Sequence, residues 1–301
     1  MTLRRSPFPE SGYGGPMTVL AHGAVRKLGN AHAVLRFDAA HPEPTGATGQ
    51  RLLFVDDRPS FELTPWCGTC PMLFERKEGA DRTLSIPDLA ARLEAGLSDV
   101  DSSVIESFAE LLPVGKYQPM LLSISPHLVF PLDRDDYFAH EQVQTWGIDP
   151  FWGLPAHPRT PYYRTFDTAV SPHSHLYEFV VPMVPPSWND SDRVRHFEQR
   201  LRTESTPTAV AVSILDVCVP AVAHEGRDYY AHWSLIHFLL DGHHKLEAAA
   251  RTGRPLRLLS LLAVDAGLTE KGEIADLLGV RSGQPSVRVP RGTTPSAARF
   301  S

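Results

Sequence analysis

The stretch from His232 to Val264 constrains the fold more than any other part of the chain. An apolar run, Leu235 to Leu240, is followed by Asp241-Gly242 and then by a segment whose apolar residues recur at helical spacing. Gly253 ends that segment, and a second apolar run continues to Val264. The pattern predicts a strand, a tight turn, a helix and a second buried strand.

The turn before this helix is the best candidate site. The first N–H groups of a helix have no acceptor within it, and the helix dipole favours a negative charge there. Gly242 would let a ligand approach the backbone, and His243, His244 and Lys245 would help to hold a phosphate. Asp241 is expected to orient a histidine or to help bind Mg²⁺. Alternatively, Asp241 caps an ordinary polar helix start.

The composition is that of a globular protein and excludes some partners. With 301 residues, 42% of them hydrophobic, the chain can bury one large core or two modest ones. A formal net charge of −6 argues against a dedicated nucleic-acid binder. No apolar run approaches the roughly 20 residues of a membrane span, and the N-terminus lacks the pattern of a signal peptide. We therefore expect no membrane partner and a cytoplasmic location.

Local patterns divide the chain into four parts. Residues 1–17 are expected to form a flexible arm, 18–189 a β-rich N-terminal or lid region, 190–267 the core, and 268–301 a helix with a disordered tail. Within these parts, capping residues and apolar spacing predict helices at 85–97, 102–112 and 190–202, and strands at 18–20, 33–37, 51–55, 118–124, 127–130, 176–184 and 208–217. The proline- and aromatic-rich stretch 149–164 is expected to be an ordered loop.

The order of elements in the C-terminal half resembles the ParB and sulfiredoxin superfamily. The matching residues are Asp241-Gly-His-His-Lys245, the alanines of 248–250 and Gly253, within about residues 190 to 267. The resemblance implies an α+β fold with a mixed-sheet core in the C-terminal half and an elaborated β-rich N-terminal part. In that superfamily this turn binds nucleotide phosphates. Lys245 stands where the resemblance calls for arginine, and neither the helix-turn-helix of the partition proteins nor the reductase's catalytic cysteine is present.

The resemblance implies a nucleotide-dependent phosphotransferase, closest to the free-amino-acid kinases of the superfamily. It would act on a small polar metabolite with ATP or ADP and Mg²⁺. Gly242, His243, His244 and Lys245 would hold the nucleotide, and Asp241, His243 and His244 would take part in catalysis. A carboxylate is also needed as a base or Mg²⁺ ligand. Glu141 and Glu178 are the preferred candidates, and Arg159 and Arg164 would bind the substrate. The other acidic candidates are Asp133, Asp135, Asp136 and Asp216.

Other functions remain open. One is a nucleotide- or phosphometabolite-binding protein without catalysis. Another is a thiol oxidoreductase that uses Cys67 and Cys70, although this pair could also bind a metal together with Cys218 and a histidine, or form a structural turn. The segment containing His173, His175 and Glu178 has the spacing of some metal sites, but it is better explained as a polar rim. The expected ligands are a nucleotide and a small-molecule substrate, with no metal site held by protein side chains alone. The sequence does not determine the oligomeric state.

Overall fold

The computed structural model describes residues 19–39, 51–63, 75–130, 133–136, 139, 160–171, 174–203, 206–218, 231–269 and 271–283. Over these residues the protein is an α+β structure with one large mixed sheet, one small antiparallel sheet and five α-helices.

The large sheet has nine strands in the order β1-β7-β13-β11-β12-β10-β9-β8, with β2 also paired to β7. The pairs β10–β12 and β11–β13 are parallel, and the other pairs are antiparallel. The strands are β1 Val19–His22, β2 Arg26–Leu28, β7 Gly115–Ile124, β8 His127–Val129, β9 Tyr162–Ser171, β10 Ser174–Pro182, β11 Thr208–Cys218, β12 Ala231–Asp241 and β13 Leu256–Ala263. The central strands are buried on nearly every residue because both faces of the sheet are covered.

The small sheet follows the order β3-β4-β5-β6 and is antiparallel throughout. Its strands are β3 Leu35–Ala39, β4 Arg51–Val55, β5 Arg58–Leu63 and β6 Glu75–Arg76. Every second side chain of β4 is buried, as expected for a sheet that covers a core with one face. Asp56 and Asp57 join β4 to β5 with positive φ angles of 49° and 59°, a backbone suited to a tight hairpin.

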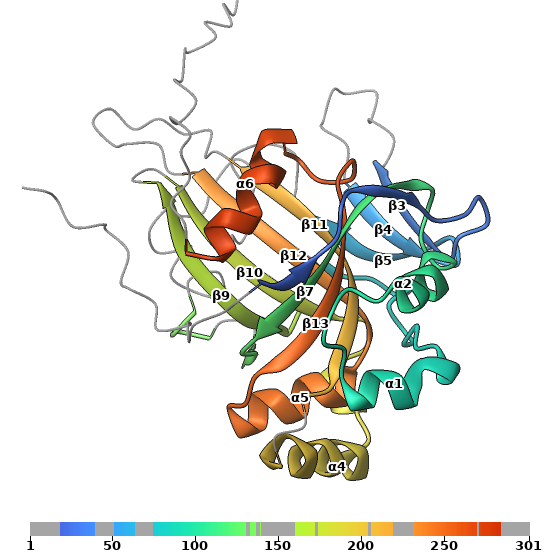
Figure 1. Cartoon of the computed structure of the whole chain (residues 1–301), viewed down its shortest axis with the longest axis vertical. Coiled ribbons are helices and arrows are strands. Elements are labelled where there is room, and N and C mark those ends of the chain that lie inside the picture. Colours follow the sequence, from blue (N-terminus) through green and yellow to red (C-terminus); the bar gives the residue numbers. More distant parts are fainter. Residues whose placement is uncertain are drawn as a thin grey trace, which may run out of the picture.

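The helices lie on the two faces and at one end of the large sheet (Figure 1). The helix α6 lies across β10 to β12, and α5 and α4 pack on each other at the end where β12 finishes (Figure 1). On the other side lie α1, α2 and the small sheet (Figure 1). The helices are α1 Ala90–Ala95, α2 Ser102–Ala109, α4 Ser191–Arg202, α5 His243–Thr252 and α6 Lys271–Arg281, with 3₁₀ turns at Pro87–Leu89 and Pro186–Trp188.

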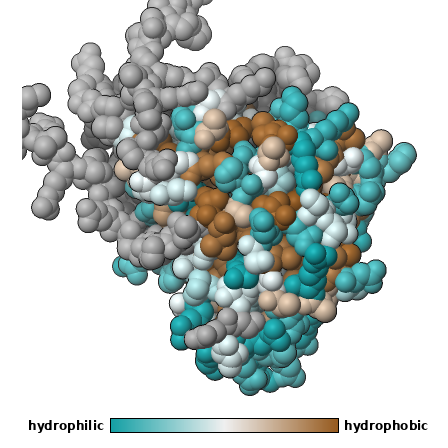
Figure 2. Space-filling view, in the orientation of Figure 1, coloured by the Kyte–Doolittle hydropathy of each residue, from teal (hydrophilic) through white to brown (hydrophobic). Residues whose placement is uncertain are grey.

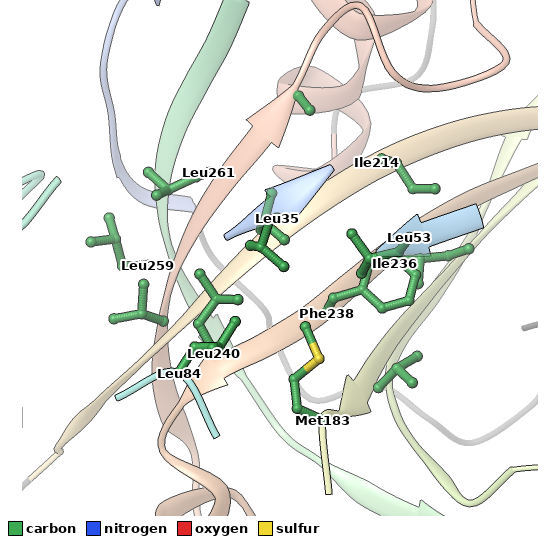
Figure 3. Packing of buried hydrophobic residues seen from close by; sticks show 14 of the residues in the cluster. Leu35, Leu53, Leu84, Met183, Ile214, Ile236, Phe238, Leu240, Leu259 and Leu261 are labelled. Carbon is green, nitrogen blue, oxygen red and sulfur yellow. The ribbon is translucent and has the colours of Figure 1, made fainter. Parts of the chain in front are cut away.

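Two apolar clusters lie on opposite faces of the large sheet. One joins that sheet to the small sheet, with Leu35 and Leu53 packed against Ile214, Ile236 and Phe238 (Figure 3). The other lies under α4, α5 and α6. Hydrophilic side chains surround the end of the molecule where α4 and α5 lie, whereas hydrophobic and polar side chains alternate over the middle of the same view (Figure 2).

Most of the predicted elements are confirmed, with shifts of a few residues at their ends. Two predictions are corrected. Residues 162–164 were expected in a loop but belong to β9, where they pair with β8 and β10. The helix predicted at 85–97 was expected to begin with a side-chain cap, but it is preceded by a 3₁₀ turn that begins after Ile86 without one. The strand β5 was not expected.

Strands from both sides of the expected boundary at residue 190 pair within one sheet, since β10 lies beside β12 and β7 beside β13. Among the described residues, no helix is long and apolar enough to cross a membrane.

Candidate functional site

The turn that the sequence singles out lies between the end of β12 and the start of α5. Gly242 has φ of 102° and directly precedes α5, and Gly253 with φ of 61° ends that helix. The backbone thus turns from a buried strand into a helix within one residue. This confirms the strand, turn and helix predicted there.

The start of α5 has no side-chain cap. In α2 and α4 the carboxylates of Asp101 and Asp190 accept hydrogen bonds from first-turn N–H groups, but Gly242 has no side chain to do so. The intrahelical bonds of α5 begin with Leu246 N–H, which donates to the Gly242 carbonyl at 2.8 Å. The three N–H groups before it, at residues 243–245, make no hydrogen bond to any described residue. The described structure therefore supplies no acceptor for the first turn of α5.

Gly242 itself is required by close packing. A β-carbon at this position would lie 2.7 Å from Cβ of Ala209 and 3.0 Å from its Cα, and the positive φ already disfavours a side chain. The sequence suggested that the missing side chain leaves room for a ligand. The structure instead shows that β11 fills that room.

Lys245 and Asp241 form an ion pair beside this turn. The Lys245 ammonium donates to Oδ2 of Asp241 and to the carbonyl of Thr208, both at 2.9 Å, and little of either side chain is exposed. Burial alone would raise the pKa of the Asp241 carboxyl, but Lys245 and a hydrogen bond from Ser85 outweigh it and lower the pKa. Lys245 thus ties α5 to β11, and its ammonium already has two acceptors.

His243 is a buried neutral histidine. Its Nε2 accepts a hydrogen bond from the Met183 N–H at 3.0 Å, and burial lowers the pKa of the ring to about 3. The ring proton therefore resides on Nδ1, which is buried and has no hydrogen-bond partner among the described residues.

His244 is half-buried and contacts a different segment. Its Nε2 accepts from the Asp190 N–H at 3.1 Å, and burial together with Arg193 lowers the pKa of the ring. The two histidines thus act as acceptors for backbone N–H groups on both sides of residues 183–190, which connect β10 to α4. We call this segment the 183–190 connection.

Glu178 lies far inside the sheet. Its Oε1 accepts from Thr165 at 2.7 Å and from Nη2 of Arg281 at 2.6 Å, and it lies 3.7 Å from Nε2 of His237. Burial would raise the pKa of Glu178, but Arg281 and His237 lower it to about 2. The row of buried polar groups continues from His237 Nδ1 to Ser213 (2.6 Å), and from Ser213 to Ser260 (2.9 Å).

Arg164 is also fully buried, on the opposite face of the sheet. Its guanidinium lies 2.9 Å from a carboxylate oxygen of Asp167 and 3.2 Å from one of Asp136, and it packs over the ring of Tyr177. His175 lies 3.4 Å from the other oxygen of Asp167. These groups form a second polar cluster near the start of β10, away from the α5 turn.

The remaining acidic candidate on the large sheet is Asp216. Its carboxylate binds Arg51 at 2.8 Å and the Leu268 N–H at 2.7 Å, so it links the small sheet to the loop after β13. Glu141, Arg159, Cys67, Cys70 and His173 lie outside the described residues. Their predicted roles stay predictions.

The structure brings Asp241 and residues 242–245 together but does not bring Glu178 or Arg164 to them. Sequence reasoning missed Ser85 and Asn189 beside the turn, and Asn189 donates to Glu247 at 2.5 Å. It also missed the histidine in the buried row, His237, whose polar side chain stands within an apolar strand. A histidine within an apolar run is the sequence signal that could have indicated a buried polar group here. No group of three side chains suited to a metal ion occurs in the described part of the chain.

No protein-family model matches the chain, and no curated protein or solved structure matches it significantly. The resemblance to the ParB and sulfiredoxin superfamily therefore stays a hypothesis based on the residues of the turn.

Proposed function

We propose that this protein binds the phosphate groups of a nucleotide or phosphometabolite at the start of α5. The observation that supports this best is the uncapped helix start, with three successive N–H groups that have no acceptor in the described structure. Such groups, together with the helix dipole, form an anion site without any charged side chain.

The geometry suggests a division of roles that differs from the sequence-based expectation. Lys245, His243 and His244 hold the helix start against β11 and the 183–190 connection, and the backbone would bind the phosphate. The Nδ1–H of His243 is buried and has no hydrogen-bond partner among the described residues. Both rings have lowered pKa values, so binding would rely on neutral donors rather than on imidazolium charge.

Binding is better supported than phosphoryl transfer. The carboxylate nearest to the turn, Asp241, is already paired with Lys245, and Glu178 is sealed beneath α6. A phosphotransferase with ATP or ADP and Mg²⁺ remains the catalytic form of the same hypothesis. Asp241 directly precedes the turn, and the carboxylates of Asp190 and Glu247 act on His244. Single-turnover incubation with labelled ATP and a panel of small polar metabolites separates the two, because a binding protein returns the ATP unchanged.

The binding proposal is tested by following backbone amide resonances during titration with ATP and with tripolyphosphate. We expect the resonances of residues 243–245 to move most, because their N–H groups would donate to the ligand. A matched pair of variants adds a second test. His244→Glu places a negative charge at the helix start and should abolish binding, whereas His244→Gln keeps an acceptor for Asp190 N–H and should retain it. Equal binding by both variants would refute the site.

A further inference from the structure

A row of buried polar side chains crosses the large sheet on the face that carries α6. Its members belong to five neighbouring strands, β9, β10, β12, β11 and β13, and are Thr165, Glu178, His237, Ser213 and Ser260. The apolar side chains on the same face of these strands form the cluster under α4, α5 and α6, and α6 lies across β10 to β12 (Figure 1). The row therefore lies inside the core, where ionisable and hydroxyl groups are uncommon.

Arg281, the last residue of α6, binds the carboxylate in this row. Its Nη2 donates to Oε1 of Glu178 at 2.6 Å, and its Nε forms an ion pair with Oε2 of the same carboxylate. The carbon of the guanidinium lies 5.0 Å from the centre of the Phe166 ring. A carboxylate that offers both oxygens and an aromatic face are the groups that recognise a guanidinium. Arg281 is thus held as a bound guanidinium compound would be.

Two donors beside Glu178 have no acceptor in the described part of the chain. Ser260 donates to Ser213, so the Ser213 hydroxyl donates to Nδ1 of His237 and the ring proton resides on Nε2. That nitrogen lies 3.7 Å from Glu178, beyond hydrogen-bond distance, and Nη1 of Arg281 is buried without a described partner. Because such donors cost free energy, a core selected for stability alone would have apolar side chains here.

The loop that precedes α6 is firmly attached to β11, whereas α6 is attached by its side chains. The Leu268 carbonyl accepts from Val217 N–H at 2.9 Å, and the Leu268 N–H donates to Asp216 at 2.7 Å. Arg51 donates to the Ala266 carbonyl at 2.6 Å. In the described part of the chain, no backbone hydrogen bond joins 271–283 to a strand. A movement of α6 would therefore pivot after residue 268 and leave the loop in place.

We infer that Arg281 occupies a binding site for a small guanidinium compound, and that α6 is the lid that opens for it. Glu178 would bind the guanidinium of the compound and Phe166 would cover it, as they do for Arg281. In the native chain Arg281 competes with the compound at an effective concentration of about millimolar order, because both groups bind the same carboxylate. This site would recognise a cation, so it is independent of the anion site proposed at α5.

The test uses ethylguanidinium, with ethylurea as a neutral control of nearly the same shape, in calorimetric titrations of the full chain. We expect Arg281→Ala to bind ethylguanidinium about tenfold or more tightly than the native protein, because the competing side chain is gone. Ethylurea should bind to neither protein. Arg281→Ala with Glu178→Gln keeps the space but loses the carboxylate, and it should not bind. If Arg281→Ala and the double variant bind equally, or if neither binds, the site is wrong.

A second measurement uses the native protein and does not depend on the folding of any variant. Ethylguanidinium should accelerate hydrogen exchange in 271–281 and leave exchange slow in β11 and β12, whereas ethylurea should change neither. If α6 of the native protein does not respond, Arg281 is only a structural partner of Glu178 and the inference fails, even if Arg281→Ala binds the compound. Faster exchange throughout the sheet would indicate general denaturation and would also overturn it.

Discussion

Gly242 shows how one residue can serve packing and backbone geometry together. Its φ of 102° is a conformation that side chains rarely adopt, and Ala209 occupies the place of a β-carbon. A β-carbon at residue 242 would cause both backbone strain and a close contact with Ala209, and these two effects have different origins. They can therefore be separated by mutation.

We expect Gly242→Ala to destabilise the protein by about 2 to 4 kcal/mol, the sum of backbone strain and overpacking. Adding Ala209→Gly to the same chain should recover only the packing part, because the strain at residue 242 remains. Urea unfolding of the two single variants and the double variant measures both terms. Full recovery in the double variant would show that strain contributes nothing.

Glu178 gives a pH dependence whose sign follows from its pKa. The folded-state pKa of about 2 lies below the ordinary value of 4.5, so the stabilisation is present above pH 4.5 and is lost as the pH falls towards 2. The difference corresponds to about 3 kcal/mol. Because other carboxyls titrate in the same range, the native protein is compared with Glu178→Gln at each pH. The stability gap between them should close by about pH 2, and a constant gap would contradict the assignment.

At the scale of elements, α6 is attached to the sheet by apolar contacts and one buried charge pair. Ile274 and Leu277 lie in the cluster under the helix, and Arg281 at its end reaches Glu178. Buried ion pairs contribute little net stability but are costly to break, since one charge is left without a partner.

We therefore expect Arg281→Met to loosen α6 selectively. Hydrogen exchange should become faster in 271–281 and remain slow in β11 and β12, because those strands are held by ladders on both sides. The matched control is Arg281→Met with Glu178→Gln, which removes the unpaired charge and should restore most of the protection. Uniformly faster exchange over the whole sheet would show that α6 is not a separate cooperative unit.

The same elements show which features the sequence makes predictable. The β11, α5 and β13 segments were expected because apolar periodicity and glycine signals are local. The strand β9 was missed because its first residues, Tyr162 to Arg164, continue a proline-rich stretch and include a buried arginine. An arginine is buried only when partners compensate its charge, and those partners are not visible in local sequence.

The place of the candidate site was predictable, but the partners of its side chains were not. Glycine after an apolar strand marks the helix start. However, the acceptors and donors that bind Lys245, His243 and His244 lie 37, 60 and 54 residues away in the chain. Only the tertiary arrangement shows that these side chains hold neighbouring segments.

At the scale of the whole molecule, the two sheets share one core. Phe61 of β5 packs against Phe238 of β12 with ring centroids 5.3 Å apart, and Arg51 of β4 binds Asp216 of β11. Apolar contacts of this kind make separate unfolding of the small sheet unfavourable.

We expect Phe61→Ala to destabilise the protein by about 3 to 5 kcal/mol and to lower one common unfolding transition. Far-ultraviolet circular dichroism reports on both sheets, and Trp233 fluorescence reports on β12 in variants that lack the other tryptophans. Coincident midpoints by the two probes are the expected result. Two separated midpoints would mean that the small sheet unfolds independently.

The pairing of β7 with β13 has a consequence for how the chain is made. Residue 124 pairs with residue 256, and residue 117 pairs with residue 263, so β7 has one of its neighbours only after most of the chain has left the ribosome. Contacts between such distant positions slow folding and leave apolar strands exposed meanwhile. Arrest of translation before residue 256 should therefore give nascent chains that recruit chaperones and resist release, whereas arrest well beyond residue 283 should give chains that protect β7 from protease.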